Sequence, residues 1–288
     1  MNCAMLAALD AETPAAQQAL SQVPDWFETW EQAFSRFRPA SELCRLNARL
    51  GEWVSVSADL FAVLSAAQQA YELTDGWVTP SVLDALEAAG YDRSFDAAGM
   101  SAARAPVPAG LPPQLDPVRR RAHLGARLDL GGIAKGWCAQ QAMHRLAEHA
   151  ATLMDAGGDI AISGPRGDGS AWPVGIAHPL NDAEDIALLV LREPCGIATS
   201  GRDYRRWGRG QHHLLDPHTG APAQTTVLSV TAIAPSVLEA EAAAKRVLLQ
   251  GAEPGLAWLA RQVGFEALLV LEDGNAHASP GFMQHVWR

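Results

Sequence analysis

The chain has 288 residues, of which 48% are hydrophobic and 19% are charged, and its formal net charge at pH 7 is -10. This composition is that of an ordinary globular protein with enough chain for a large core, and it excludes an intrinsically disordered chain. The acidic balance excludes a protein that holds nucleic acid by neutralising its phosphates, since such proteins gather Lys and Arg on one surface. A small anionic ligand stays compatible with it, because such a ligand needs only a local cation or a helix end.

The cysteines and the apolar runs restrict the class of protein further. The four cysteines form no CxxC pair and have no metal-type histidine spacing, so neither a zinc site nor a disulfide framework is predicted. The longest apolar stretches, such as residues 186–191, have the length of a strand and are too short for a transmembrane segment. As given, the chain is predicted to be cytoplasmic, since no basic N-terminal segment precedes a long apolar run.

Helices are predicted in the first third of the chain. Residues 13–37 carry large apolar side chains at steps of three and four residues, which is the helical period. Pro24 lies within this stretch and predicts a kink or a division into two shorter helices. Further helices are predicted at residues 58–73 and 81–89, each followed by a glycine that favours a stop.

The middle of the chain begins with a predicted connection. Residues 97–117 are rich in Ala, Gly and Pro and poor in large apolar groups, so a surface connection that ends in an extended segment is expected there. A strand that ends at Leu130 follows, then two glycines, then a helix at about residues 133–149. This stretch is the best candidate for a linker, and residues 1–288 are predicted to form a single domain with a surface connection at about residues 97–117.

The second half alternates short strands and turns before one long helix. That helix is predicted at residues 236–250, with Ser236 as its N-cap and Gly251 at its C-terminal end. Strands that look antiparallel and are interrupted by long helices favour an α+β fold over a regular βαβ winding. The strands are predicted at residues 151–155, 160–163, 173–177, 186–191, 196–199, 227–234 and 267–271.

A glycine pair between a predicted strand and a helix is the first candidate for chemistry. It lies in residues 128–136, Leu-Asp-Leu-Gly-Gly-Ile-Ala-Lys-Gly. Without Cβ atoms there, a phosphate can approach the amides of the first helical turn. Lys135 adds a positive charge, and Asp129 can accept hydrogen bonds from an adenine, a ribose or an isoalloxazine edge. A tight turn without a ligand stays open as the alternative, while GxGxxG and GxxxxGK[ST] are absent, which excludes a Rossmann fingerprint and a P-loop.

The second candidate is a cluster of three histidines at residues 211–222, Gln-His-His-Leu-Leu-Asp-Pro-His-Thr-Gly-Ala-Pro. Histidine can move protons near neutral pH, so this cluster predicts acid-base chemistry. Its Asp-Pro-x-Thr-Gly portion is also typical of a turn, so Asp216 is either a cap of that turn or a functional group. Metal binding by these histidines is less well supported, because no additional residues stand at a spacing typical of metal ligands.

The third candidate is a pair of opposite charges on the helix at residues 236–250. Glu241 and Lys245 are one turn apart on the same face. On local grounds they form an ordinary helix ion pair that contributes about 0.2 to 0.5 kcal/mol.

Together the three segments resemble the ApbE-type FAD:protein FMN transferases. Further matches stand in the expected order across residues 34–251, and their number and order are more specific than any one of them. They are residues 34–39 (Phe-Ser-Arg-Phe-Arg-Pro), 41–43 (Ser-Glu-Leu), 45–47 (Arg-Leu-Asn), 75–80 (Asp-Gly-Trp-Val-Thr-Pro), 155–160 (Asp-Ala-Gly-Gly-Asp-Ile) and 198–201 (Ala-Thr-Ser-Gly).

The resemblance implies an α+β, tunnelling-fold-like body that binds FAD with Mg²⁺ at the diphosphate. Such enzymes cleave the FAD diphosphate and attach FMN by a phosphoester to a Ser or Thr of an acceptor protein, a reaction known as protein flavinylation. Two alternatives stay open, namely a protein that binds FAD without transfer and an FAD diphosphatase that gives FMN and AMP. The partners implied are FAD and an acceptor protein with a Ser/Thr target motif.

The resemblance also implies roles for particular residues. His213 is expected to be catalytic, and Gly132 and Glu241 are expected to bind the metal. Contacts with FAD are expected from Phe37, Trp77, Val78, Thr79, Asp129, Lys135 and Leu215.

This chain departs from the family pattern at two positions. Thr79 stands where an Asp is common. Glu241 and Lys245 stand where the family commonly has an Asp and a Thr as metal ligands, and an ammonium is no metal ligand. Two outcomes stay open: either Glu241 binds Mg²⁺ through oxygen, or Lys245 neutralises part of the diphosphate charge and weakens or replaces the metal.

Overall fold

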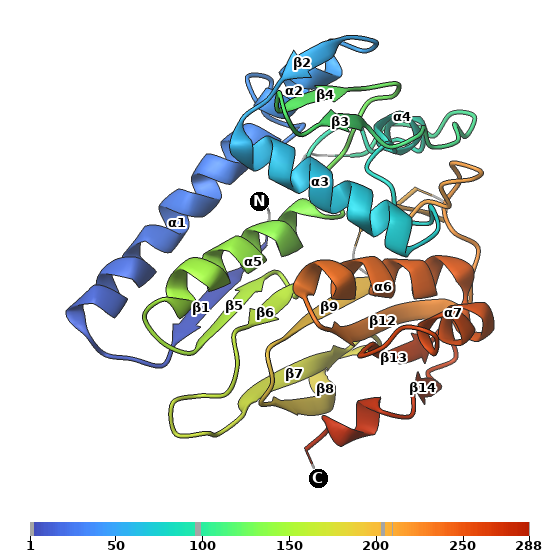
Figure 1. The fold of residues 1–288 in the computed structure, drawn as a ribbon. Coiled ribbons are helices and arrows are strands. Elements are labelled where there is room, and N and C mark those ends of the chain that lie inside the picture. The colour runs from blue at the N-terminus through green and yellow to red at the C-terminus, as the bar shows by residue number, and fades with distance from the viewer. Residues whose placement is uncertain (1–2, 96–98, 203–204, 209, 288) are drawn as a thin grey trace. The chain divides into compact units, whose positions relative to one another are not determined.

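A computed structural model describes residues 3–95, 99–202, 205–208 and 210–287 (Figure 1). The chain divides into two compact units. Unit 1 comprises Met1–Phe27, Lys135–Gly201 and Thr225–Arg288, and unit 2 comprises Glu28–Ala134 and Arg202–Gln224. A single domain over residues 1–288 therefore stays a prediction.

Unit 1 is built on a seven-stranded antiparallel sheet. The order across the sheet is β1 (Met5–Leu9), β5 (Thr152–Ala156), β6 (Ile160–Ile162), β9 (Cys195–Gly201), β12 (Val227–Ala234), β13 (Glu266–Leu271) and β14 (Ala276–Ala278). Strand β12 is buried along its whole length. A strand buried on both faces needs cover on both sides of the sheet, and unit 1 provides it.

Helices cover one face of this sheet and a hairpin covers the other. In Figure 1, α5 (Ala134–Ala147) and α6 (Val237–Gln250) lie along one face, and α6 packs on β9 and β12. The hairpin β7 (Trp172–His178) and β8 (Asn181–Leu191) packs its apolar side chains against the opposite face, where Phe282 of the short helix η1 (Phe282–Gln284) joins the core. These mixed helices and antiparallel strands confirm the predicted α+β class.

Local sequence chemistry sets the limits of α6. Ser236 Oγ accepts a hydrogen bond from the Glu239 amide at 3.3 Å and donates one to Glu239 Oε2 at 2.7 Å, so the two residues cap the helix reciprocally. At the other end Gly251 has φ 89° and its amide donates to the carbonyl of Val247. Both predicted ends are confirmed. The helix α7 (Ala252–Leu259) follows at once.

Unit 2 combines short helices with small sheets. Its helices are α2 (Glu42–Asn47), α3 (Ala58–Leu73) and α4 (Leu83–Ala88). Its sheets are β2 (Trp53–Ser55), β4 (Arg121–His123) and β3 (Gln114–Asp116) in that order, and the pair β10 (Arg206–Trp207) and β11 (Gln211–His212). Residues 99–113 form an irregular and largely exposed connection that ends in β3, as the composition predicted, while residues 97 and 98 of the predicted connection lie outside the described residues.

Helix α1 (Pro14–Phe34) runs without interruption through Pro24. The predicted division into two shorter helices is therefore wrong. Proline removes one backbone hydrogen bond from a helix, and buried apolar side chains on both sides of it, Val23 and Phe27, offset that loss.

The strand predicted to end at Leu130 is also wrong. Residues 124–130 form neither a strand nor a helix. The side chain of Asn47 supplies the bonds that a neighbouring strand would supply: its Oδ1 accepts from the Leu128 amide at 2.8 Å, and its Nδ2 donates to the Leu128 carbonyl at 2.9 Å. The Asp129 amide donates to the Pro80 carbonyl at 2.8 Å. These bonds satisfy the buried backbone without a sheet.

None of the described helices is both long enough and apolar enough to cross a membrane.

Candidate functional site

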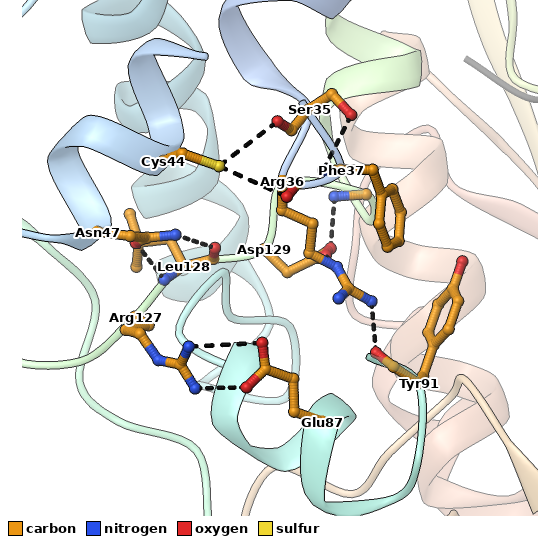
Figure 2. Close-up of polar contacts among 11 residues, drawn as sticks. Ser35, Arg36, Phe37, Cys44, Asn47, Glu87, Tyr91, Arg127, Leu128 and Asp129 are labelled. Carbon is orange, nitrogen blue, oxygen red and sulfur yellow. Dashed lines mark hydrogen bonds and ion pairs between the residues drawn. The ribbon is translucent and has the colours of Figure 1, made fainter. Parts of the chain in front are cut away.

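The glycine-rich loop of unit 2 begins at a firmly held carboxylate. Asp129 Oδ1 accepts the amide hydrogen of Gly131 at 2.7 Å, and Oδ2 lies 2.5 Å from Arg36 Nε in an ion pair (Figure 2). The two side chains are only 13% and 5% exposed, so water screens this pair poorly. A Cβ on residue 131 would lie 2.8 Å from Asp129 Oδ1, which explains the glycine at that position.

Arg36 connects this carboxylate to a group of aromatic rings. Its Nη2 donates to the Tyr91 carbonyl at 2.8 Å, and its guanidinium lies 4.2 Å from the Phe37 ring centroid and 4.7 Å from that of Tyr91 (Figure 2). The Phe37 and Tyr91 centroids are 5.9 Å apart, and Phe37 remains 41% exposed. Arg36 thus fixes Asp129 beside an exposed aromatic face on which a planar ring can stack.

The predicted turn at residues 75–80 is tightly hydrogen-bonded. Thr74 Oγ1 accepts from the Val78 amide at 3.0 Å, and Thr79 Oγ1 accepts from the Ser81 amide at 3.2 Å. Val78 is buried, whereas Trp77 and Thr79 are half-buried. Because Thr79 uses its hydroxyl oxygen to hold the turn, its side chain has a structural task besides any contact with FAD.

The turn meets the histidine segment through Trp77. The rings of Trp77 and His218 lie edge to face with centroids 4.7 Å apart. His218 itself is exposed, and its Nδ1 is 3.1 Å from Asp216 Oδ1, which also accepts the His218 amide hydrogen. Asp216 therefore caps its turn, and Gly220 closes that turn with φ 71°. The structural alternative for Asp216 is confirmed.

The three histidines have three different environments. His212 is buried in β11, and its burial, with the charges of Arg202 and Arg206, lowers its pKa to about 4. It is neutral at pH 7. His213 is half-buried, whereas His218 is exposed. His213 alone combines partial shelter with access, which suits a group that exchanges a proton with a bound substrate.

Leu215 belongs to the core of unit 2. Its side chain is 7% exposed and packs in one cluster with Tyr91, beside Trp207. Leu215 packs against these aromatic side chains. Because it is buried, its side chain can make little contact with FAD.

In unit 1 the loop continues into α5 with Lys135. The Lys135 ammonium forms an ion pair with Asp159, a buried carboxylate just before β6. Burial alone would lower the pKa of Lys135, but the negative charges of Asp159 and Glu241 outweigh it and raise the pKa. Lys135 is therefore cationic throughout the neutral range, and it remains 22% exposed.

Glu241 lies beside this pair on α6 and is 1% exposed. Its Oε1 accepts from Lys245 Nζ at 2.8 Å, while Oε2 is buried and has no hydrogen-bond partner among the described residues. A Cβ on residue 136 would lie 2.6 Å from Oε2, so Gly136 lets the carboxylate approach α5. Burial and the charge of Asp159 raise the pKa of Glu241, and Lys245 and Lys135 oppose that shift.

The structure thus brings the predicted residues together in two groups. In unit 1, Lys135 and Glu241 share one charged group. In unit 2, the 211–222 segment meets the 75–80 turn, and Asp129 joins Phe37 through Arg36. Sequence reasoning assigned no role to Arg36, Asp159 or Tyr91. Arg36 and Asp159 lie inside matched motifs, and the positive charge of Lys135 was the signal that a carboxylate would be needed nearby.

The structure thus combines an antiparallel α+β body with a glycine-rich loop that leads into α5, where the half-buried Lys135 lies in the first turn. The chain belongs to the ApbE family, whose model matches residues 3–269.

Known proteins similar to this chain support that membership. An FAD:protein FMN transferase of Treponema pallidum is 33% identical over 96% of this chain and 84% of its own length. The solved ApbE protein of Thermotoga maritima is 27% identical with a TM-score of 0.84, over 98% of this chain and 94% of that one. The flavin transferase ApbE of Vibrio cholerae, 24% identical over 98% of each chain with a TM-score of 0.77, shares the fold.

Proposed function

We propose that this chain is an FAD:protein FMN transferase, which moves FMN from FAD to a Ser or Thr of an acceptor protein. The observation that carries the proposal is the charged group of unit 1, in which the buried Asp159 holds the Lys135 ammonium in the first turn of α5. In unit 2, Arg36 holds Asp129, whose Oδ1 accepts the Gly131 amide hydrogen. Family membership and the names of the curated relatives support the same reaction.

The reaction balances without any redox step. The acceptor hydroxyl oxygen attacks the phosphorus of the FMN half of FAD, and a phosphoester bond forms. The bond from that phosphorus to the bridging oxygen breaks, and AMP leaves with the electron pair on that oxygen. We assign His213 as the group that takes the hydroxyl proton, since the neighbouring His212 is buried away from a substrate and its pKa, lowered to about 4, makes it a weak base.

The other residues bind FAD in this proposal. Lys135 places a permanent positive charge at the diphosphate. Phe37 offers an exposed ring face, and Trp77 offers the half-buried edge of the turn. Four further residues of unit 2 belong to the proposed FAD-binding region, namely Asp129, Val78, Thr79 and Leu215.

The sequence left open whether Mg²⁺ binds Gly132 and Glu241 or is replaced, and the charges around Glu241 favour replacement. No group of three His, Cys, Asp or Glu residues in the described part of the chain is arranged to hold a metal ion. One oxygen of Glu241 already accepts from Lys245. An ion bound to the other oxygen would lie within about 7 Å of Nζ, given Mg–O distances of about 2.1 Å and the 2.8 Å hydrogen bond.

The Lys245 ammonium weakens the binding of an ion in that arrangement. At an effective dielectric constant of about 20, a divalent ion about 7 Å from an ammonium is repelled by about 5 kcal/mol. Lys135 adds a second ammonium that acts on the same carboxylate. Two ammonium groups at the one carboxylate expected to bind the metal do not fit a magnesium ion.

Product identification tests the proposed function. The protein is incubated with FAD and a flavin-acceptor peptide, and the products are separated by chromatography and mass spectrometry. Transfer predicts AMP together with a fluorescent FMN-peptide. Free FMN and AMP without peptide adduct would instead show a diphosphatase, and bound FAD with no products would show a binding protein.

Two variants sharpen this experiment. His213→Ala should abolish the adduct while FAD binding persists, because the lost group moves a proton and does not hold the diphosphate. His277→Ala removes an exposed histidine from the edge strand β14 and serves as the matched control. Equal adduct from His213→Ala and the control would contradict the assignment of His213. The compartment, expected to be the cytoplasm, stays a prediction.

A further inference from the structure

The lysines of this chain occur only where the diphosphate is expected. The chain has 20 arginines and two lysines, and the two lysines are Lys135 and Lys245. Arginine therefore serves every other cationic position. Lysine is a compact charge with three donors that can turn toward a single oxygen, whereas arginine is a broad planar fork. Both lysines pair with buried carboxylates of unit 1, Asp159 and Glu241. We infer that this position needs a compact ammonium and not a planar guanidinium.

Lys245 has donors to spare. Its Nζ makes one hydrogen bond within the described residues, to Glu241 Oε1 at 2.8 Å. The side chain is 17% exposed, and the backbone on either side of it, Ala244 and Arg246, is packed into the buried face of α6. Two of its three N–H groups thus remain for water or a ligand. An ammonium held on one side by a buried carboxylate is already oriented for an anion on its other side.

Two ion pairs organise this group. Lys135 is paired with Asp159, and Lys245 is paired with Glu241. Hard cations need several carboxylate oxygens, and here an ammonium already occupies one oxygen of each paired carboxylate. A third carboxylate, Asp155, interacts with Asp159 and Lys135, and burial, which disfavours its charged form, raises its pKa. Gly136 lets the Glu241 carboxylate lie close to α5, because a Cβ there would be 2.6 Å from Oε2.

We propose that the Lys245 ammonium takes the place of a divalent cation at the FAD diphosphate, so that this chain binds and uses FAD without Mg²⁺. The inference rests on the proposed function, since it concerns the same substrate. Lys245 donates its free N–H groups to a non-bridging phosphate oxygen, and Glu241 holds it there. As the bridging bond breaks, the negative charge on the phosphates meets two fixed ammonium groups in place of an ion.

Calorimetric titration with FAD tests the binding half of this proposal. Protein dialysed against EDTA should bind FAD as tightly as protein in an excess of MgCl₂, to within about twofold. Lys245→Met should weaken binding by about tenfold or more, since a charge-assisted hydrogen bond is lost. Lys245→Arg should recover part of the affinity. Arg261→Met removes an exposed charge from unit 1 and should bind as the parent does.

A gain of metal dependence completes the test. Lys245→Thr removes the ammonium and adds an oxygen ligand, so its FAD affinity should be low in EDTA and should rise when MgCl₂ is added. Circular dichroism and thermal melting confirm that each variant is folded. Parent protein that binds FAD only with Mg²⁺, together with Lys245→Met that binds like the parent, would overturn the inference and leave the transferase proposal intact.

Magnetic resonance gives a readout that does not depend on turnover. Because the chain has two lysines, protein labelled with ¹⁵N at lysine Nζ gives two side-chain signals. Both signals should shift when FAD is added in EDTA, and neither should shift with MgCl₂ alone. A shift of the Lys245 signal with MgCl₂ alone would contradict the proposal. Absence of FAD binding under every condition would instead refute the proposed function itself.

Discussion

Arg36 Nε lies 2.5 Å from Asp129 Oδ2, and the same guanidinium covers the rings of Phe37 and Tyr91. Arg36 thus joins the start of the glycine-rich loop to the exposed aromatic face of unit 2. The ion pair is nearly buried, so removing either partner would leave the other charge buried without compensation and would destabilise the protein. We regard Arg36 as a positioning residue that acts through Asp129 and Phe37.

Arg36→Met should destabilise the protein by about 3 kcal/mol, because it leaves the Asp129 carboxylate buried without its cation. Urea unfolding measures this loss. FAD affinity should fall as well, since Asp129 and Phe37 lose their common support. The double variant Arg36→Met/Asp129→Asn should be less destabilised than the sum of the two single variants. Additive losses would show that the pair has no energetic coupling. Arg38→Met, which breaks an exposed pair with Glu28, serves as the control.

Asn47→Ala should disorder the approach to the glycine-rich loop. The side chain of Asn47 is the partner of both the amide and the carbonyl of Leu128, and all four atoms are buried. Leaving two buried backbone groups unpaired should cost about 2 to 4 kcal/mol. Hydrogen exchange of the Leu128 amide should speed up in this variant. Unchanged exchange would contradict the role given to Asn47, and Asn275→Ala in an exposed turn is the matched control.

Local chemistry explains which elements the sequence predicts. The helix α6 is predicted at both ends because Ser236 and Gly251 cap it within the segment itself. The neighbouring helix α7 is missed because Pro254 and Gly255 are typical of a turn. Proline is tolerated in the first turn of a helix, and Gly255 lies where a Cβ would be 2.9 Å from the Val247 Cα, so tertiary packing requires it.

The same distinction holds for the site. The loop at residues 129–136 and the turn at residues 75–80 are recognisable because their glycines and charges are close in sequence. The pairing of Arg36 with Asp129 and the bonding of Asn47 to Leu128 join residues far apart in the chain, and no periodicity encodes such contacts. The strand predicted to end at Leu130 is wrong for that reason, because the local sequence does not indicate that the distant side chain of Asn47 takes the backbone bonds of Leu128.

Gly136→Ala sets helix propensity against packing. Alanine should favour α5 by up to about 1 kcal/mol. Its Cβ would lie 2.6 Å from Glu241 Oε2, and overpacking of this kind typically costs about 1 to 3 kcal/mol. We expect net destabilisation and weaker FAD binding, because Glu241 must move and Lys245 moves with it. Gly125→Ala has open space around its Cβ and should be nearly neutral. A stabilised Gly136→Ala protein would show that the Glu241 carboxylate does not need its present position.

His212 should make the protein less stable as the pH falls. Its folded pKa, lowered to about 4 by burial and by nearby arginines, lies below its value in the unfolded chain. Between pH 6.5 and pH 4 the unfolded state therefore binds a proton that the folded state does not, so stability rises with pH across this window. The contribution is fully present above about pH 6.5 and is lost progressively below it. At pH 5 the loss relative to pH 7 should be about 2 kcal/mol.

The measurement compares urea unfolding at pH 7 and pH 5 for the parent and for His212→Gln, whose amide can still bond to the backbone of Ala223. The variant should be less stable at pH 7 but should lose about 2 kcal/mol less on acidification, because no proton uptake occurs at this position. His178→Gln, which changes a half-buried histidine at the C-terminal end of β7, leaves His212 in place and serves as the control, so it should keep the parent's pH dependence. Equal pH dependence in the parent, His212→Gln and His178→Gln proteins would contradict this prediction. Other groups, such as the buried carboxylates of unit 1, would then control the loss of stability in acid.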